Sequence, residues 1–374
     1  MLARAPFRIR ESPVKIQRQQ QNCNRRETKY WLTTVVKRFI RCGLICCALA
    51  LFGDAQITSK DFPNGGRPTL DAHNCYPYEG QWSDRIDRAL AQGNPVSIEQ
   101  DLAWYRDPAT KEGKVVVTHS AMTNGTEPTL KAYFFERVRP IVEKALKENK
   151  REQWPLIILH FDFKDNQTDL LRAVWKLLAE YEPWLTTAVK TADVRSISPF
   201  QTGPILAVTE DSDAQQRVFF DELPVGSKLR VFGSAHTNLP RTGSQAELDH
   251  VMATLAPDKL LTEHANNYRR WWNNSWHEVE EGGQTRAGDW TPSKMDRLRA
   301  LVNRAHELGY WIRFYTLDGF GPESDKGWSE GYNFGSMEAV RVRWQASIDA
   351  GVDMIATDQY EGLAAMLRSN RISR

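Results

Sequence analysis

Short apolar runs alternate with longer amphipathic stretches from residue 70 to the end of the chain. A short apolar run bounded by turn-forming residues is typical of a buried strand. Because such runs alternate with helical patterns, the sequence predicts βαβ units and a parallel sheet. The predicted strands are Leu70–Asn74, Val96–Leu102, Val115–His119, Leu156–Phe163, Ile205–Val208, Leu229–Phe232, Leu260–Glu263, Tyr310–Leu317 and Met354–Thr357.

Five longer stretches carry apolar residues at helical spacing and are predicted as helices. Ser83 is the expected N-cap of the first, and the last one leads directly into the final strand. Their ranges are Ser83–Gln92, Leu130–Asn149, Asn166–Tyr181, Pro292–Leu308 and Ser336–Ala350.

The number of strands favours an eight-stranded (β/α)8 barrel with one additional strand. Val115–His119 is the additional strand, because it follows Val96–Leu102 too closely for a crossover helix. A doubly wound sheet is the rival architecture, but it favours a Gly-rich first turn, and none follows the first strand. No linker or internal repeat is visible, so residues 56–374 are predicted to form one domain.

Charge divides the chain into two parts. Residues 1–43 carry a net charge of +9, and the remainder carries −7, because the whole chain is +2. An acidic body is repelled by a phosphate backbone, so nucleic-acid binding is excluded as a function.

The N-terminal segment, residues 1–55, is predicted to be a basic leader with a secretory signal. The run from Leu44 to Phe52 is apolar, and cleavage just before Gln56 is expected. This predicts export to the periplasm or the extracellular space; the alternative is an uncleaved membrane anchor. Four of the five cysteines lie in this leader, so Cys75 has no partner for a disulfide in the body.

Two carboxylates, Glu99 and Asp101, are two residues apart on a predicted strand and so point to the same side of it. Neighbouring carboxylates repel each other unless a proton or a cation lies between them, and Mg²⁺ or Ca²⁺ suits oxygen ligands. Asp162 is the expected third ligand, and Lys164 is placed to meet a phosphate oxygen. The alternative is that the pair simply faces solvent at the end of a strand.

Two histidines, His73 and His119, each end a predicted strand, where barrel enzymes carry their functional residues. Histidine titrates near neutral pH, so one ring can accept a proton while the other donates one. A structural role is the alternative for each.

The aromatic and amide-rich stretch 266–276 is expected to be a βα loop that forms a ligand wall or a lid; the alternative is packing on the barrel rim. Tyr315 and Asp318 are expected to border the same pocket and to contact the substrate.

These residues resemble the glycerophosphodiester phosphodiesterase group of the phospholipase-C-like barrel superfamily. The resemblance covers residues 70–365. Within the superfamily, the sequence looks closest to the branch of proteins similar to altered inheritance of mitochondria protein 6. It implies His73 and His119 as base and acid, with the carboxylates as Mg²⁺ or Ca²⁺ ligands. The motifs that carry it are His73-Asn74, Glu99-x-Asp101, His119, Asp162-x-Lys164, Thr316-Leu317-Asp318 and Thr357-Asp358.

One departure concerns the substrate. Asn74 stands where the family carries an arginine that contacts phosphate, and it is expected to contact the substrate instead. The resemblance predicts cleavage of a small-molecule or lipid phosphodiester, to a cyclic or an open product, with transient contact at a membrane surface. The alternative is a barrel that binds a phosphorylated lipid or sugar without cleaving it. A glycosidase is a third reading, disfavoured because Glu99 and Asp101 are neighbours on one strand.

Overall fold

The computed structural model describes residues 65–372, except 79–80, 241, 285–286 and 320–332. Eight parallel strands close into a barrel, because the first strand pairs with both the second and the last. The predicted (β/α)8 architecture is therefore confirmed. In order around the barrel, the strands are β1 Thr69–Ala72, β2 Val96–Arg106, β4 Ile157–Phe163, β6 Ile205–Thr209, β8 Phe232–Ser234, β9 Arg269–Ser275, β10 Trp311–Tyr315 and β11 Met354–Thr357.

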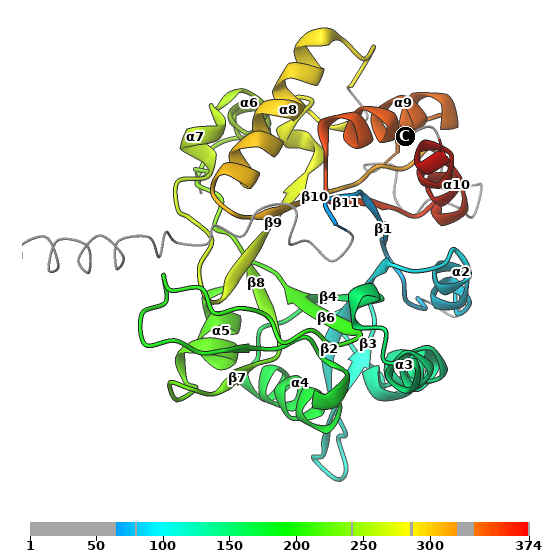
Figure 1. Cartoon of the computed structure of the whole chain (residues 1–374), viewed down its shortest axis with the longest axis vertical. Helices are drawn as coiled ribbons and strands as arrows, with labels where there is room; N and C mark the ends of the chain where they lie inside the picture. Colours follow the sequence, from blue (N-terminus) through cyan, green and yellow to red (C-terminus); the bar gives the residue numbers. More distant parts are fainter. Residues whose placement is uncertain (1–64, 79–80, 241, 285–286, 320–332, 373–374) are drawn as a thin grey trace, which may run out of the picture. The chain divides into compact units, whose positions relative to one another are not determined.

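The helices lie outside the strands (Figure 1). The four longer predicted helices are confirmed, and Ser336 caps the helix of residues 337–350 by accepting a hydrogen bond from the Ala339 amide. The predicted cap at Ser83 is wrong, since that helix starts after Asp84 without a side-chain cap. The helices are α2 Arg85–Ala91, α3 Glu136–Glu148, α4 Thr168–Glu180, α5 Asp213–Gln216, α6 Gln245–Thr254, α7 Pro257–Leu260, α8 Pro292–Glu307, α9 Met337–Ala350 and α10 Tyr360–Ile372.

The additional strand, β3 (Gly113–Val117), lies outside the barrel, as predicted. It runs antiparallel to the far end of β2, where Leu102–Arg106 pairs with it. The first part of β2, Val96–Leu102, pairs with β4 and belongs to the barrel. The strand thus continues past Glu99 and Asp101, which were expected at its end.

Two predictions about the sixth barrel strand are wrong. Leu260 ends the short helix α7, and residues 261–263 do not form a strand. The barrel strand is β9, from the segment predicted to be a loop or a lid, so that interpretation is wrong as well. The error has a physical cause, because β9 carries arginine, tryptophan and asparagine side chains into a polar barrel interior and lacks an apolar run.

The predicted strand Leu229–Phe232 is two strands. Lys228–Leu229 (β7) pairs antiparallel with Ala188–Val189 (β5) in a small separate ribbon, and only β8 joins the barrel.

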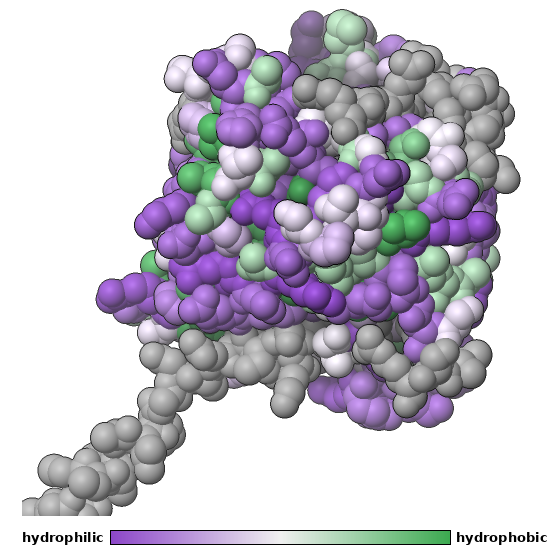
Figure 2. Space-filling model, turned by 90° about the horizontal axis from the view of Figure 1, so that it is seen from above, coloured by the Kyte–Doolittle hydropathy of each residue, from purple (hydrophilic) through white to green (hydrophobic). Residues whose placement is uncertain are grey.

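Exposed large hydrophobic side chains are scattered among the described residues: Met122, Val189, Val225 and Val342. The face seen in Figure 2 is mainly hydrophilic. Within the described ranges, no helix has the length and apolar character needed to cross a bilayer. The predicted leader, with its signal and its four cysteines, lies outside the described residues; Cys75 is buried and has a free thiol.

Glu278 gives the fold a testable pH dependence. Burial raises the pKa of this carboxyl from 4.5 to about 8. Between these values the native state binds a proton that the unfolded state has lost, so the free energy of unfolding falls as the pH rises. Glu278→Gln should therefore gain thermal stability over the wild type from pH 5 to pH 9. Thermal melts across this range, with exposed Glu222→Gln as the control, check it. Parallel wild-type and Glu278→Gln curves would contradict it.

Candidate active site and cation-binding cluster

Three carboxylates meet inside the barrel, as the sequence analysis expected. Glu99 and Asp101 project from β2, and Asp162 projects from β4 at the position paired with Asp101. One oxygen from each lies within 4.8 Å of the other two. Glu99 and Asp101 are buried, whereas the Asp162 side chain is 34% exposed. The cluster is therefore open to a ligand on the Asp162 side.

Lys164 lies against this cluster. Its Nζ is 2.7 Å from Asp101 Oδ2 and 2.8 Å from Asp162 Oδ2. Burial acts to lower the pKa of the ammonium, but the two carboxylates outweigh it and hold the pKa above its ordinary value. Burial raises the pKa of Asp101 to about 6. Lys164 thus supplies one positive charge to the cluster.

The donor set fits a hard divalent cation. Carboxylate oxygens at this spacing are the ligands that Mg²⁺ and Ca²⁺ prefer. The surrounding charges point the same way, because among the described residues the three carboxylates form direct ion pairs with two permanently charged cations, Lys164 and Arg313.

His73 follows β1 and is nearly fully buried. Its Nδ1 is 3.1 Å from Asp358 Oδ1, and its Nε2 is 3.7 Å from Glu99 Oε2. A carboxylate only accepts hydrogen bonds, so the contact with Asp358 is formed by a hydrogen on Nδ1; Nδ2 of Asn74 also lies 2.9 Å from Nδ1, and Nε2 faces the cluster. Burial acts to lower the pKa of His73, but Glu99 and Asp358 outweigh it and raise the pKa to about 9.

His119 follows β3 and approaches the cluster from the Asp101 side. Its Nδ1 is 2.8 Å from Asp101 Oδ2 and 3.1 Å from the Tyr76 hydroxyl. The contact with a carboxylate again assigns the hydrogen to Nδ1, so Nε2 is the nitrogen that can exchange a proton with a ligand. The side chain is 38% exposed. The two histidines therefore flank one carboxylate cluster.

Asn74 and Tyr76 connect the two histidine segments. The Asn74 amide donates to Glu99 Oε2 at 2.9 Å, and its side-chain Nδ2 donates to Asp358 Oδ1 at 3.1 Å. The buried Tyr76 hydroxyl donates to Asn74 Oδ1 at 2.5 Å. Asn74 is itself buried, so its contacts in the structure are with protein groups that hold the site together.

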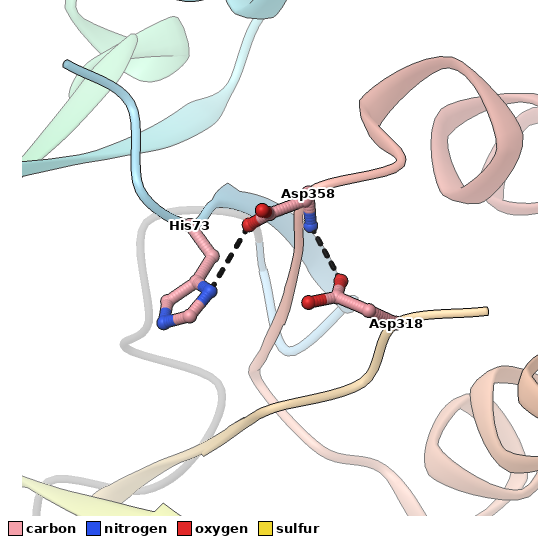
Figure 3. A group of neighbouring side chains, drawn as sticks. All are labelled: His73, Asp318 and Asp358. Atoms are coloured by element: carbon pink, nitrogen blue, oxygen red, sulfur yellow. Dashed lines mark hydrogen bonds and ion pairs between the residues drawn. The ribbon is translucent and has the colours of Figure 1, made fainter. Parts of the chain in front are cut away.

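Asp318 lies beside both His73 and Asp358: one oxygen of each carboxylate and one ring nitrogen of His73 lie within 4.8 Å of one another (Figure 3). Asp318 Oδ1 accepts hydrogen bonds from the Asp358 amide at 2.7 Å and the Thr357 hydroxyl at 2.8 Å. Burial raises its pKa to about 7. Arg85 Nη1 is 3.2 Å from Asp358 Oδ2 and completes the support of this carboxylate. Asp318 therefore contacts the residue that orients His73.

Tyr315 is half-buried at the end of β10 and faces His73. The two rings are 6.2 Å apart at an interplanar angle of 28°. Of the residues expected to contact a substrate, Tyr315 and Lys164 are partly exposed, and Asn74 and Asp318 are buried.

The sequence analysis missed Arg313, which is buried in β10 and forms an ion pair with Asp71. Its Nη2 is 3.6 Å from Glu99 Oε1, and its Nη1 donates to Asn273 Oδ1 at 2.9 Å. It sits within the apolar run Tyr310–Leu317, where a single charged residue could have signalled an inward-facing polar position.

The sequence analysis also missed Glu210, which lies beside His160. His160 is buried and joins the network, because its Nε2 is 2.6 Å from Glu210 Oε1 and its Nδ1 is 3.7 Å from Glu99 Oε1. Glu210 comes directly after β6, and its position after an apolar run was the available signal.

No protein-family model matches this sequence, and no curated protein matches it. The structure is similar to a glycerophosphoryl diester phosphodiesterase from Parabacteroides distasonis, with 14% identity, a TM-score of 0.39, and coverage of 81% of this chain and 87% of that chain. It is similar to a calcium-dependent phosphoinositol-specific phospholipase C from Pseudomonas sp., with 13% identity, a TM-score of 0.38, and coverage of 79% and 90%.

A third similar structure is the HPPK-DHPS protein of Plasmodium falciparum, with 10% identity, a TM-score of 0.40, and coverage of 82% of this chain and 49% of that chain. These structures include the kinds of protein whose motifs the sequence resembles. At such identities and TM-scores, the chemistry of this chain has to be inferred from its own side chains.

The carboxylate cluster predicts binding of a divalent cation. Asp162→Asn removes one negative ligand and should weaken Mg²⁺ or Ca²⁺ binding by roughly tenfold or more, as measured by titration calorimetry. Asp193→Asn is the matched control, because Asp193 is exposed and pairs only with nearby Arg195. Equal affinities in the wild type and in Asp162→Asn would show that this cluster is not the cation site.

Proposed function

We propose that this protein cleaves a phosphodiester by acid–base chemistry at a divalent-cation site. The observation that carries the proposal is the arrangement of His73 and His119, which flank one carboxylate cluster and each contact a carboxylate through Nδ1, with Nε2 of His73 3.7 Å from Glu99 Oε2. Glu99, Asp101 and Asp162 would hold the cation, Mg²⁺ or Ca²⁺. When bound, such a cation neutralises charge on the phosphoryl oxygens.

The two histidines divide the proton transfers. With a cation held by Glu99, a proton on His73 would be repelled and the pKa of the ring lowered from about 9. Nε2 of the neutral ring then accepts the proton of the attacking hydroxyl, whose oxygen forms the new bond to phosphorus. The bond from phosphorus to the leaving oxygen breaks, and Nε2 of His119 donates a proton to that oxygen. Attack by water gives an open monoester, and attack by a substrate hydroxyl gives a cyclic phosphate.

Fixed partners support these transfers. Asp358 keeps the hydrogen on Nδ1 of His73, and Asp101 does the same for His119. Each ring therefore exchanges protons through Nε2 alone, in one orientation. Lys164, which is partly exposed, is placed to contact a phosphoryl oxygen from the Asp162 side.

A second candidate is a barrel that binds a phosphorylated lipid or sugar without cleaving it. The contact of Lys164 with both Asp101 and Asp162 favours it, because an ammonium already balances part of the charge that a cation would balance. Under either function, export by the N-terminal leader and transient contact with a membrane surface remain proposals.

Turnover tests the first candidate directly. The full chain should hydrolyse at least one of bis(p-nitrophenyl) phosphate, glycerophosphocholine or a lysophospholipid with Mg²⁺ or Ca²⁺, and EDTA should abolish turnover. His73→Ala and His119→Ala should each lose roughly 10²–10⁴-fold in rate, since each removes an acid or a base. His250→Ala, an exposed histidine paired with Glu281, is the control.

The outcomes separate the two candidates. Equal rates for wild type and His73→Ala would exclude the acid–base mechanism. Bound cation with no turnover of any substrate, combined with tight binding of a phosphorylated ligand, would favour the binding protein.

A further inference from the structure

A fourth carboxylate, Glu210, lies on the side of the site that faces β6 and β9. Its Oε1 is 2.6 Å from Nε2 of His160, and both its oxygens are 3.0 Å from Nδ2 of Asn273. The Glu210 side chain is 27% exposed, whereas His160 is buried. Glu210 is therefore held by His160 and Asn273, and the exposed part of its side chain remains accessible to a ligand.

The orientation of these groups is fixed by their neighbours. Asn273 Oδ1 accepts a hydrogen bond from Nη1 of Arg313, so the NH₂ of Asn273 has to face Glu210. Asn273 and Arg313 are paired in register on β9 and β10. Glu210 is thus positioned by residues from strands of the barrel rather than by loops, which suits a specificity-determining group.

Glu210 is also close to the carboxylate cluster. His160 connects them, because its second nitrogen, Nδ1, is 3.7 Å from Glu99 Oε1. One of the two ester groups of a phosphodiester bound at the cluster would therefore lie near Glu210.

The charge of Glu210 requires an explanation in a site for anions. In the part of the chain that the structure describes, His160 is the only ionisable residue in an ion pair with Glu210. A carboxylate repels a phosphodiester unless it contacts a part of the ligand that is positively charged or donates hydrogen bonds. Oε2 of Glu210, which accepts only from Asn273, retains lone pairs for such a donor.

We propose that Glu210 and Asn273 form a head-group subsite that selects phosphodiesters whose head group donates hydrogen bonds. The donor is the hydroxyl of a polyol or the ammonium of an amino alcohol. A head group without donors leaves Glu210 desolvated and unpaired, and sites built to hydrogen-bond a substrate reject such analogues strongly. This proposal rests on the proposed function, because the subsite would bind the head group of the phosphodiester that is cleaved at the same site.

Four p-nitrophenyl phosphodiesters with a common leaving group test the subsite. Their second ester groups are ethanolamine, glycerol, choline and methyl; the first two donate hydrogen bonds, and the last two do not. We expect the wild-type full chain to prefer the ethanolamine or the glycerol ester in kcat/KM by roughly tenfold or more over the methyl ester, and choline, which carries a positive charge without a hydrogen-bond donor, to fall between them. Preference for ethanolamine alone identifies the ammonium, and preference for glycerol alone identifies the hydroxyl.

Glu210→Gln should abolish the preference, so that kcat/KM for the donor-bearing esters falls to the value that the same variant shows with the methyl ester. Glu222→Gln is the matched control, because Glu222 is exposed and pairs with Arg172. An equal loss on all four esters would overturn the proposal and assign Glu210 to the support of His160. Unchanged kinetics on all four would overturn it too.

Binding separates this proposal from the proposed reaction. If the wild type cleaves none of the four esters or the substrates above, the reaction fails, and titration calorimetry of the same esters tests the subsite alone. Tighter binding of the donor-bearing esters, lost in Glu210→Gln, supports the subsite without catalysis. Equal affinities for all four would overturn it.

Discussion

The buried ion pair between Arg313 and Asp71 is the interaction on which the rest of the site depends. Charges inside a protein are costly unless they are paired and hydrogen-bonded. Burial acts to raise the pKa of Glu99, but His73 and Arg313 outweigh it and lower the pKa. Arg313 thereby keeps Glu99 ionised at the base of the cluster, while Asp71 and Asn273 hold the guanidinium in place. Together with His73, this internal cation allows Glu99 to be both buried and charged.

The fold was largely predictable because alternation of apolar runs with amphipathic stretches determines a βαβ chain. The prediction failed where a strand has no apolar run. In β9, Trp271 and Asn273 point inward, and Asn273 bonds to Glu210 and Arg313, so the strand reads as polar and aromatic in the sequence. Polar side chains can face the interior of the barrel because they bond to partners on other strands. The local sequence pattern does not show these partners.

The candidate site was predictable to the extent that its residues lie on the first strands. Glu99 and Asp101 share a face by strand geometry alone, and Asp162 meets them through the register of β2 and β4. Their partners could not be predicted. Arg85 comes from a helix and reaches Asp358 only through closure of the barrel, whereas Glu210 follows β6, the neighbour of β4 in the sheet. Sequence spacing also could not distinguish Asp318, which supports Asp358, from a residue that faces a ligand.

Barrel closure has a consequence for how the chain matures. The first strand, β1, carries His73 at its end and pairs with β11, which is synthesised after all the other barrel strands. Asp358, which orients His73, follows β11 directly. A nascent chain that has already made all three carboxylates therefore still lacks the partner that fixes the histidine. The proposed chemistry is thus withheld from every translation intermediate and becomes available only when synthesis of the domain is nearly complete.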